Sequence, residues 1–232
     1  MAITVTWLGH ACWLIDTGPH KLLVDPFLDD NPAAACKAAD VEADFVLVTH
    51  GHGDHVADAA AICLRTGATL VANYEICEWH AGRGVEQAEP MNLGGQIELP
   101  FGRVKMTIAH HSSTMPDGAP GGNPGGFVLA LAGANIYIAG DTALFDEMER
   151  IGQGTYASRQ GIDLAIVPIG DRYTMGPDEA LDAVALVAPK HAAPSHYNTW
   201  PPIAQDASAW AEKVRQTGVV AHAPAPGGSI RL

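Results

Sequence analysis

Apolar residues in this chain occur mainly in short runs of β-branched and aliphatic side chains. Gly, Pro or Asp stands at most ends of these runs. Runs of this length and composition, bounded by turn-forming residues, are typical of buried β-strands. The pattern predicts strands at Thr4–Leu8, Cys12–Asp16, Leu22–Asp25, Phe45–Thr49, Thr69–Ala72, Val104–Ala109, Phe127–Ala132, Asn135–Ala139, Leu164–Ile169 and Val219–His222.

Between these runs, apolar residues recur at the spacing of an amphipathic helix. Pro177 stands where a helix would start, and Thr217-Gly218 is a typical helix end. The pattern predicts helices at Val56–Arg65, Ala143–Ile151, Asp178–Val187 and Asp206–Gln216. Hairpin-like strands come first and strand–helix units later, so the order favours an α/β (α+β) fold with mixed sheets and helices outside them.

No segment has the composition of a linker, and we interpret residues 1–232 as one domain. The stretch Asp117–Gly126, rich in Pro and Gly, is interpreted as a flexible surface loop. Hydrophobic residues make up 47% and charged residues 17%, which indicates a globular chain able to bury a sizeable core. We expect Trp7, Trp13 and Trp79 to belong to that core rather than to a binding surface.

Thirteen Lys and Arg against 26 Asp and Glu give a formal net charge of −13. Binding to nucleic acid or to an anionic membrane through charge needs a cationic surface, so neither partner is expected. The first residues lack a basic segment followed by an apolar one, and no secretory signal or membrane span is predicted. The four cysteines form no CxxC pair, which favours free thiols in a reducing cytoplasm. The oligomeric state stays open.

The strongest chemical signal is the stretch THGHGDH, from Thr49 to His55, between a predicted strand and a predicted helix. In extended backbone, residues i, i+2 and i+4 share one side, so His50, His52 and Asp54 would point the same way. His55 could turn toward them where the helix starts, and the two intervening glycines leave room. Imidazole nitrogens and carboxylate oxygens at this spacing suit divalent metal ions.

One alternative is that Asp54 only caps the helix and that the histidines are ordinary loop residues. Four ligands from one loop cannot complete two metal sites, so further candidates should stand at other strand ends. His110-His111, Asp141 and His196 follow predicted strands or a short apolar stretch. Each of them alone is more typical of a hydrogen-bonded histidine or a helix-capping aspartate, and gains meaning only as part of a set.

The HxHxDH pattern of residues 50–55 resembles that of the metallo-β-lactamase superfamily, and a later His, a GDT turn and a late His follow in the superfamily's order. Other stretches are similar, more narrowly, to a branch of small stand-alone metal-dependent hydrolases related to the ascorbate-6-phosphate lactonases. These stretches are Gly9-His10-Ala11, Asp25-Pro26-Phe27, AHHSS at 109–113, GDTALF at 140–145, PIGDRYTMGP at 168–177 and HYNT at 196–199. The resemblance implies a four-layer αββα sandwich of two mixed β-sheets flanked by helices, with a dinuclear metal centre at one edge.

The resemblance also assigns the ligands of this centre. The first ion would be held by His50, His52 and His111. The second would be held by Asp54, His55 and His196. Asp141 would bridge the two ions. In this branch the ligand directly precedes two serines, which selects His111 over His110. The ions would be divalent, zinc in the first place, with manganese or iron as alternatives.

Two ions about 3.5–4 Å apart can hold a water molecule between them and lower its pKa toward neutrality. This favours a hydrolase acting on a small-molecule ester, lactone, amide or phosphodiester. The catalytic candidates are Asp54 and His10. Contacts with the substrate are expected from Arg172, Tyr173, Tyr197 and Asn198. Arg172 would suit an anionic group, and an exposed arginine without function is the equal alternative. Asp25 is expected to organise a turn or to hydrogen-bond a ligand.

Two other branches of the superfamily fit this chain less well. The late ligand positions hold no Cys, unlike the Cys-ligated zinc β-lactamases, and 232 residues leave no room for the large inserted domain of the nucleic-acid-processing branch. Two alternatives stay open: an iron-dependent redox enzyme on the same fold, and a catalytically silent metal-binding or sensor protein. The intact ligand set and the absence of a flavin or electron-transfer segment favour hydrolysis.

Overall fold

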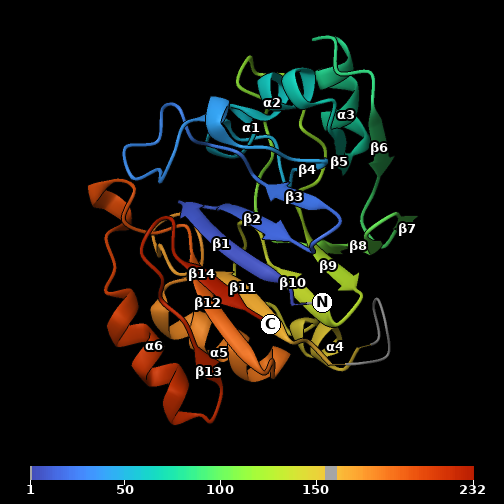
Figure 1. The fold of residues 1–232 in the computed structure, drawn as a ribbon. Helices are drawn as coiled ribbons and strands as arrows, with labels where there is room; N and C mark the ends of the chain where they lie inside the picture. Colours follow the sequence, from blue (N-terminus) through green and yellow to red (C-terminus); the bar gives the residue numbers. More distant parts are fainter. Residues whose placement is uncertain (1, 155–160) are drawn as a thin grey trace.

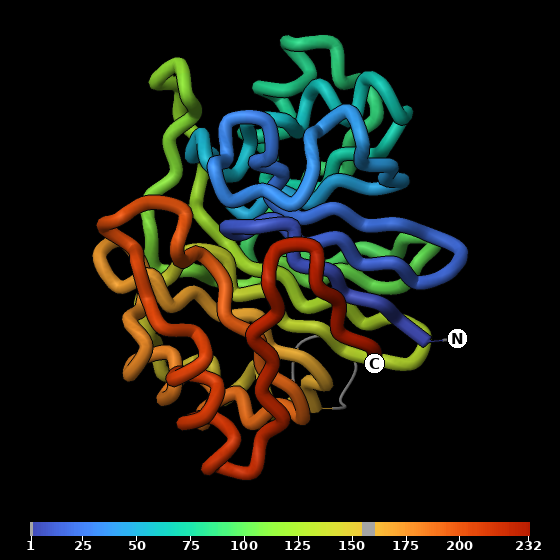
Figure 2. Tube along the Cα trace, turned by 60° about the vertical axis from the view of Figure 1, so that its left-hand side comes forward, coloured from blue at the N-terminus to red at the C-terminus, as the bar shows by residue number. Residues whose placement is uncertain are grey.

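The computed structural model describes residues 2–154 and 161–232, which form two mixed β-sheets packed face to face. The first sheet has the strand order β14-β1-β2-β3-β4-β5-β6. Its strands are β1 (Thr4–Gly9), β2 (Cys12–Asp16), β3 (Lys21–Val24), β4 (Phe45–Leu47), β5 (Thr69–Asn73), β6 (Ala88–Met91) and β14 (Ser229–Arg231). The pairs from β14 to β3 are antiparallel and those from β3 to β6 are parallel. Figure 2 shows the two chain ends close together, as the pairing of β1 with β14 requires.

The second sheet repeats this division, with the order β13-β12-β11-β10-β9-β8-β7. Its strands are β7 (Gln96–Leu99), β8 (Gly102–Ile108), β9 (Gly125–Leu131), β10 (Ala134–Ile138), β11 (Leu164–Pro168), β12 (His191–Ser195) and β13 (Val220–Ala221). Strands β7 to β10 pair antiparallel and β10 to β13 pair parallel. The carboxyl ends of the parallel strands carry the loops described below.

Helices cover the outer face of each sheet (Figure 1). Over the first sheet lie α1 (Gly53–Val56), α2 (Ala59–Thr66) and α3 (Tyr74–Ala81), and over the second lie α4 (Met148–Gly152), α5 (Pro177–Val187) and α6 (Ala207–Gln216). Two 3-10 helices, η1 (Ala38–Asp40) and η2 (Pro201–Ile203), lie in connections. The four-layer sandwich of two mixed sheets with flanking helices is confirmed. In the part of the chain that the structure describes, no helix has the length and apolarity needed to cross a membrane.

The core follows from the alternation of side chains along each strand. In β2, Trp13 and Ile15 point between the two sheets, whereas Cys12 packs beneath the helices of the first sheet. In β4, Phe45 and Leu47 point inward and Val46 points outward. Both faces of these strands are buried, which explains why the sequence shows continuous apolar runs there rather than a strict alternation.

Two predicted helices differ from the structure. The segment predicted as Val56–Arg65 is broken between α1 and α2, because the buried Asp58 turns its carboxylate toward Leu28 N (2.6 Å) and Asp29 N (3.1 Å). The segment predicted as Ala143–Ile151 is helical only from Met148 onward. Its first part is held as a loop because backbone hydrogen bonds tie it to other loops, as where Ala143 N donates to His110 O.

Several elements were not predicted. They are α3 and the strands β6, β7, β12 and β14. Strands β6 and β12 contain proline, β14 has three residues, and β7 has two of its four residues exposed, so their strand signal in the sequence is weak. These strands form because neighbouring strands offer hydrogen bonds, a feature that a local pattern does not contain.

The Pro/Gly-rich stretch Asp117–Gly126 is fixed by hydrogen bonds to the rest of the molecule. Thr114 and Pro120 form a β-bridge, and Ser113 Oγ donates to Gly121 O at 2.8 Å. Asn73 Nδ2 donates to the same carbonyl oxygen at 2.7 Å. This hairpin of residues 113–121 projects from the body of the molecule (Figure 2). The expectation of a flexible loop is therefore corrected, because hydrogen bonds from Asn73 Nδ2 and from Gly51 N, the latter to Ser113 Oγ at 3.0 Å, anchor its base.

Candidate metal centre

The histidine-rich loop follows β4 and enters α1. His52 is the helix N-cap in extended backbone, and the helix begins at Gly53. His50 and His52 therefore lie in the extended segment, as expected, but Asp54 already belongs to the first helical turn. Asp54 is not the N-cap, and its carboxylate turns toward other histidines. The alternative that Asp54 only caps this helix does not hold.

The structure gathers the predicted ligands and His10 into two adjoining groups that share no residue, and a third group, of His50, His55 and Asp141, links them. One group consists of His50, His52 and His111. The other consists of His10, Asp54, His55 and His196. Within each group, one potential ligand atom of every residue lies within 4.8 Å of the others. These residues come from separate loops that all leave the same edge of the two sheets, which is where parallel α/β sheets commonly place their sites.

Asp141 lies between the two groups. Its Oδ2 atom is 3.0 Å from His196 Nε2, 3.4 Å from His55 Nε2, 3.7 Å from His111 Nε2 and 4.0 Å from His50 Nε2. The residue is buried and follows β10. One carboxylate oxygen thus faces imidazoles of both groups, the position that a ligand shared by two cations would take.

Opposite charges in this buried cluster shift its pKa values strongly. Burial alone would raise the pKa of Asp141, but the positive charge of His196 and His55 holds it well below its usual range. Burial lowers the pKa of His196, and the charge and hydrogen bond of Asp141 outweigh this effect and raise it to about 9. His50, which burial and neighbouring histidines dominate, has its pKa lowered instead. Such shifts are typical of functional sites.

Asp25 orients two of the histidines. Its carboxylate accepts hydrogen bonds from His55 Nδ1 (2.9 Å), Thr49 Oγ1 (2.7 Å) and Thr49 N (2.8 Å). Because the threonine hydroxyl donates to Asp25, it accepts from His50 Nδ1 at 3.0 Å. Both rings therefore carry their Nδ1 protons outward and present Nε2 to the centre. Asp25 itself has a φ of 44°, a left-handed conformation that is uncommon outside glycine.

His10 lies against Asp54, and its ring centroid is 4.1 Å from that of His196. Its Nε2 lies 3.1 Å from Asp54 Oδ2 and its Nδ1 lies 2.7 Å from Thr199 Oγ1. Burial lowers the pKa of His10 to about 4, so its ring is neutral at physiological pH. Burial raises the pKa of Asp54, but hydrogen bonds with His10 and His196 outweigh it and hold the carboxyl well below its usual range. His10 therefore donates its Nε2 proton to an ionised carboxylate.

The donor set fits divalent cations. His55 Nε2 is buried and has no hydrogen-bond partner, and it points toward Asp141. This nitrogen can carry a proton toward the Asp141 carboxylate, 3.4 Å away, or bind a cation in place of that proton. Together, six imidazoles and two carboxylates offer only nitrogen and oxygen ligands, a combination that suits zinc, manganese or iron.

The two adjacent histidines before the serine pair have different environments. His111 Nε2 reaches Asp141, whereas the ring of His110 is exposed and stacks on Phe145 at a centroid distance of 5.1 Å. The structure thus brings His111, and not His110, into the cluster. Ser112 Oγ lies 3.3 Å from His52 Nε2, a contact that the sequence did not indicate.

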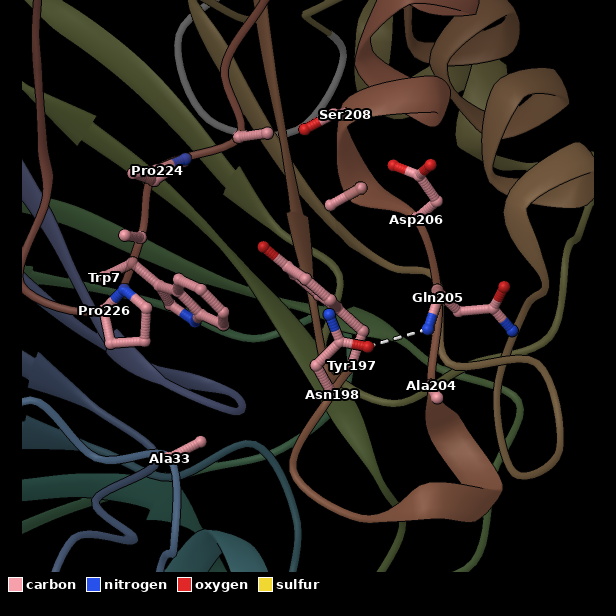
Figure 3. A pocket seen from close by; sticks show the side chains of 13 residues that line it. Trp7, Ala33, Tyr197, Asn198, Ala204, Gln205, Asp206, Ser208, Pro224 and Pro226 are labelled. Atoms are coloured by element: carbon pink, nitrogen blue, oxygen red, sulfur yellow. Dashed lines mark hydrogen bonds between the residues drawn. The ribbon is translucent and has the colours of Figure 1, made fainter.

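Of the expected substrate residues, two are exposed and two line a separate cavity. Arg172 and Tyr173 lie in the exposed loop after β11, with the guanidinium 5.6 Å from the aromatic ring. Tyr197 stacks on Trp7, and Asn198 Oδ1 accepts from Gln205 N at 2.7 Å (Figure 3). Both line a cavity of about 700 Å³, which none of the clustered ligands lines. The structure therefore does not bring these four residues together with the centre.

Access to the centre is one-sided. His52, Asp54 and His111 are partly exposed, whereas His10, His50, His55, His196 and Asp141 are buried.

Thr199 was missed as a site residue, although it belongs to the HYNT stretch that the sequence singled out. Phe27 and Trp200 were missed as well, and their rings pack 5.7 Å and 5.1 Å from the ring of His10. Only the fold brings these residues to the histidine.

Comparison with known proteins agrees with this geometry. A family model described as "Beta-lactamase superfamily domain" matches residues 14–197. A UPF0173 metal-dependent hydrolase of Thermus thermophilus is 46% identical over 99% of both chains, and one of Methanopyrus kandleri is 46% identical over 93% of both.

Solved structures show the same relationship. Igni18, a novel metallo hydrolase from the archaeon Ignicoccus hospitalis, matches with a TM-score of 0.89 at 32% identity, over 100% of this chain and 99% of that one. An isothiocyanate hydrolase from Delia radicum gut bacteria, with a TM-score of 0.77 and 18% identity over 98% of each chain, shares the fold. From the matched model, the relatives and the site, the chain belongs to the β-lactamase superfamily, among its UPF0173 metal-dependent hydrolases.

Proposed function

We propose that this protein hydrolyses a small-molecule ester, lactone, amide or phosphodiester at a centre of two divalent cations, zinc in the first place and manganese or iron as alternatives. The observation that carries the proposal is the position of Asp141 Oδ2, which lies within 4.0 Å of imidazole nitrogens from both ligand groups. A shared carboxylate between two groups of nitrogen ligands is the arrangement of a dinuclear hydrolytic centre.

The residues divide between the two cations by group. His50, His52 and His111 would hold one. Asp54, His55 and His196 would hold the other. Asp141 would contact both. When bound, the cations supply Lewis acidity, which lowers the pKa of water and polarises the substrate oxygen.

Asp54 is our candidate for orienting the attacking water, because its ionised carboxylate accepts hydrogen bonds but has a pKa too low to hold a proton. Its carboxyl is ionised, it is partly exposed on the open side of the centre, and its Oδ2 lies 3.7 Å from His196 Nε2. A carboxylate oxygen at this place can accept a hydrogen bond from the attacking water and so fix its direction. His10 holds the carboxylate in position through its Nε2 proton, so we assign His10 as a positioning residue and Asp54 as the catalytic one.

The substrate is expected to be small. The acidic chain, with a formal net charge of −13, is a poor partner for nucleic acid or an anionic membrane. An anionic group on the substrate could meet Arg172 only if the exposed loop after β11 approaches the centre in the complex. We further propose that residues 1–232 act as one domain in the cytoplasm, where the four free thiols persist.

Metal content and activity test the proposal together. Protein purified without a histidine tag should contain about two zinc or manganese ions per chain and should hydrolyse members of a panel of lactones, esters, phosphodiesters and amides. His52→Ala and Asp141→Ala should lose metal and activity together, whereas His110→Ala, at an exposed ring outside the cluster, should keep both.

Three other outcomes would contradict the proposal or favour one of the alternatives. Full activity in the metal-free protein would overturn the proposal. One iron ion per chain without hydrolysis would favour the redox alternative, and two bound metal ions without turnover of any panel member would favour the sensor alternative.

A further inference from the structure

A second cavity, of about 530 Å³, adjoins the metal-ligand loop. It lies between the loop after β3, the first two helices, α3 and the anchored hairpin. Its walls are mainly apolar and include Phe27, Val56, Ala60, Trp79 and Pro116. Trp79 was expected in the core, but it is only half-buried, because its ring forms a wall of this cavity. A concave, mostly apolar space of this volume suits a small-molecule ligand.

The cavity borders the ligand loop at Gly53. This residue lines the cavity and lies in the chain between His52 and Asp54, two of the partly exposed ligands. Apart from its chain neighbours and its own helix backbone, the atom nearest to a Cβ built at Gly53 would be Pro116 Cγ, 4.0 Å away, so no other segment packs tightly against this position. A molecule that reacts at the open side of the centre can therefore extend over Gly53 into the cavity.

The charged residues that line the cavity do not favour an anionic ligand. Arg83, the cation in its lining, packs its guanidinium 3.2 Å from the centroid of the Trp79 ring and donates to Asp117 Oδ2 at 2.8 Å. Its charge is thus neutralised by a neighbouring carboxylate. Asp30 adds a further negative charge at the rim. An uncharged, apolar group can bind to this surface without the desolvation cost that a charged group would have.

We propose that this cavity binds an apolar acyl or alkyl arm of the substrate whose scissile bond lies at the metal centre. The inference rests on the proposed hydrolytic function and narrows its substrate class to molecules with a medium-length uncharged hydrocarbon arm. Each methylene buried in the cavity should raise kcat/KM by up to about fourfold, and by less where the arm stays partly exposed.

A chain-length series tests this specificity. The metal-loaded protein is assayed with p-nitrophenyl esters from acetate to decanoate, and kcat/KM should rise with acyl length until the cavity is full. Ala60→Trp, and the smaller Ala60→Leu, place bulk inside the cavity and should abolish this rise while the acetate ester is still hydrolysed. Ala61→Trp is the matched control, because the neighbouring Ala61 is exposed on the same helix and lines none of the described cavities.

A binding series separates this proposal from the proposed function. Alkylamides of increasing length are titrated against the same proteins and followed by ligand-observed NMR, which needs neither turnover nor metal. Tighter binding with length, lost in Ala60→Trp and kept in Ala61→Trp, supports the cavity even if no ester is hydrolysed. Binding and kcat/KM that do not depend on chain length, or that depend on it equally in Ala60→Trp, overturn the proposal whether or not the short ester is hydrolysed.

Discussion

Replacing Asp25 by Asn should weaken metal binding by changing the tautomers of two ligand histidines. The carboxylate accepts three hydrogen bonds at 2.7–2.9 Å in a buried position. Asn has nearly the same shape and tolerates the φ of 44°, so the backbone need not move. Its carbonyl oxygen can keep the bond from Thr49 N. Its amide then faces the Thr49 hydroxyl and His55 Nδ1 with N–H groups instead of lone pairs.

In Asp25→Asn, the ring protons of His55 and His50 move from Nδ1 to Nε2. His55 Nδ1 must accept the amide proton, which leaves the ring proton on Nε2, the atom that faces Asp141. The Thr49 hydroxyl, no longer donating to a carboxylate, donates to His50 Nδ1 and forces the same change there. A protonated Nε2 cannot bind a cation. Loss of such an orienting partner typically lowers metal affinity 10- to 100-fold, which is about 1.4–2.8 kcal/mol.

The assay is competition for zinc against a chromogenic chelator, with the ring nitrogens of the same samples observed by ¹⁵N NMR. Asp44→Asn is the control, because Asp44 also accepts a backbone hydrogen bond, from Lys21 N at 2.8 Å, but lies exposed and away from the centre. The control should keep both metal ions with unchanged affinity. If Asp25→Asn binds two ions as tightly as the unaltered protein, the tautomer argument is refuted.

Three further predictions test burial and packing. The pKa of His10 lies at about 4 in the folded chain, below its usual 6.5, so the unfolded chain binds more protons between these values and stability must rise with pH there. In urea unfolding of metal-free protein, His10→Asn should reduce this slope by up to about 1.4 kcal/mol per pH unit, and an equal slope would contradict the assignment. Burial raises the pKa of three cysteine thiols strongly, so iodoacetamide at pH 8 should modify only the partly exposed Cys36 in the folded protein, and equally fast labelling of all four would contradict the buried positions. Gly170→Ala places a Cβ 2.3 Å from His196 O and should lower both stability and zinc affinity, whereas Gly152→Ala, with a Cβ 2.1 Å from Val187 O, should lower stability alone; equal zinc affinities in the two variants would show that Gly170 does not position His196.

The ligand loop could be recognised from the sequence because its chemistry is local. His50, His52, Asp54 and His55 lie within six residues and follow a strand whose apolar run is unmistakable. The residues His110-His111, Asp141 and His196 were candidates because they follow strands or an apolar stretch, but only the family resemblance assigned them as ligands and chose His111 over His110, because each stands alone in its own segment. The structure then placed all of them at one sheet edge, since the strands that precede them end there.

Elements with weak local signals were missed or misplaced for a physical reason. Strand β12, which ends one residue before His196, contains proline and small residues, and it forms because β11 and β13 flank it. The break between α1 and α2 depends on Asp58 bonding to backbone that lies 29 and 30 residues earlier. Helical periodicity extends through such a break, because the pattern contains no information about the distant donor.

The sequence by itself determined the α/β class with mixed sheets, the acidic and globular character of the chain, and a compact loop of nitrogen and oxygen ligands, whereas the sandwich of two sheets followed from the family resemblance. These features depend on composition and on patterns among residues that are close in the chain. The tertiary structure alone decided that Asp25 sets two histidine tautomers, that His10 is held by Thr199, 189 residues away, and that an apolar cavity opens beside Gly53. Each of these features is formed by groups from segments far apart in the chain. Only the packing of the whole chain brings those segments together.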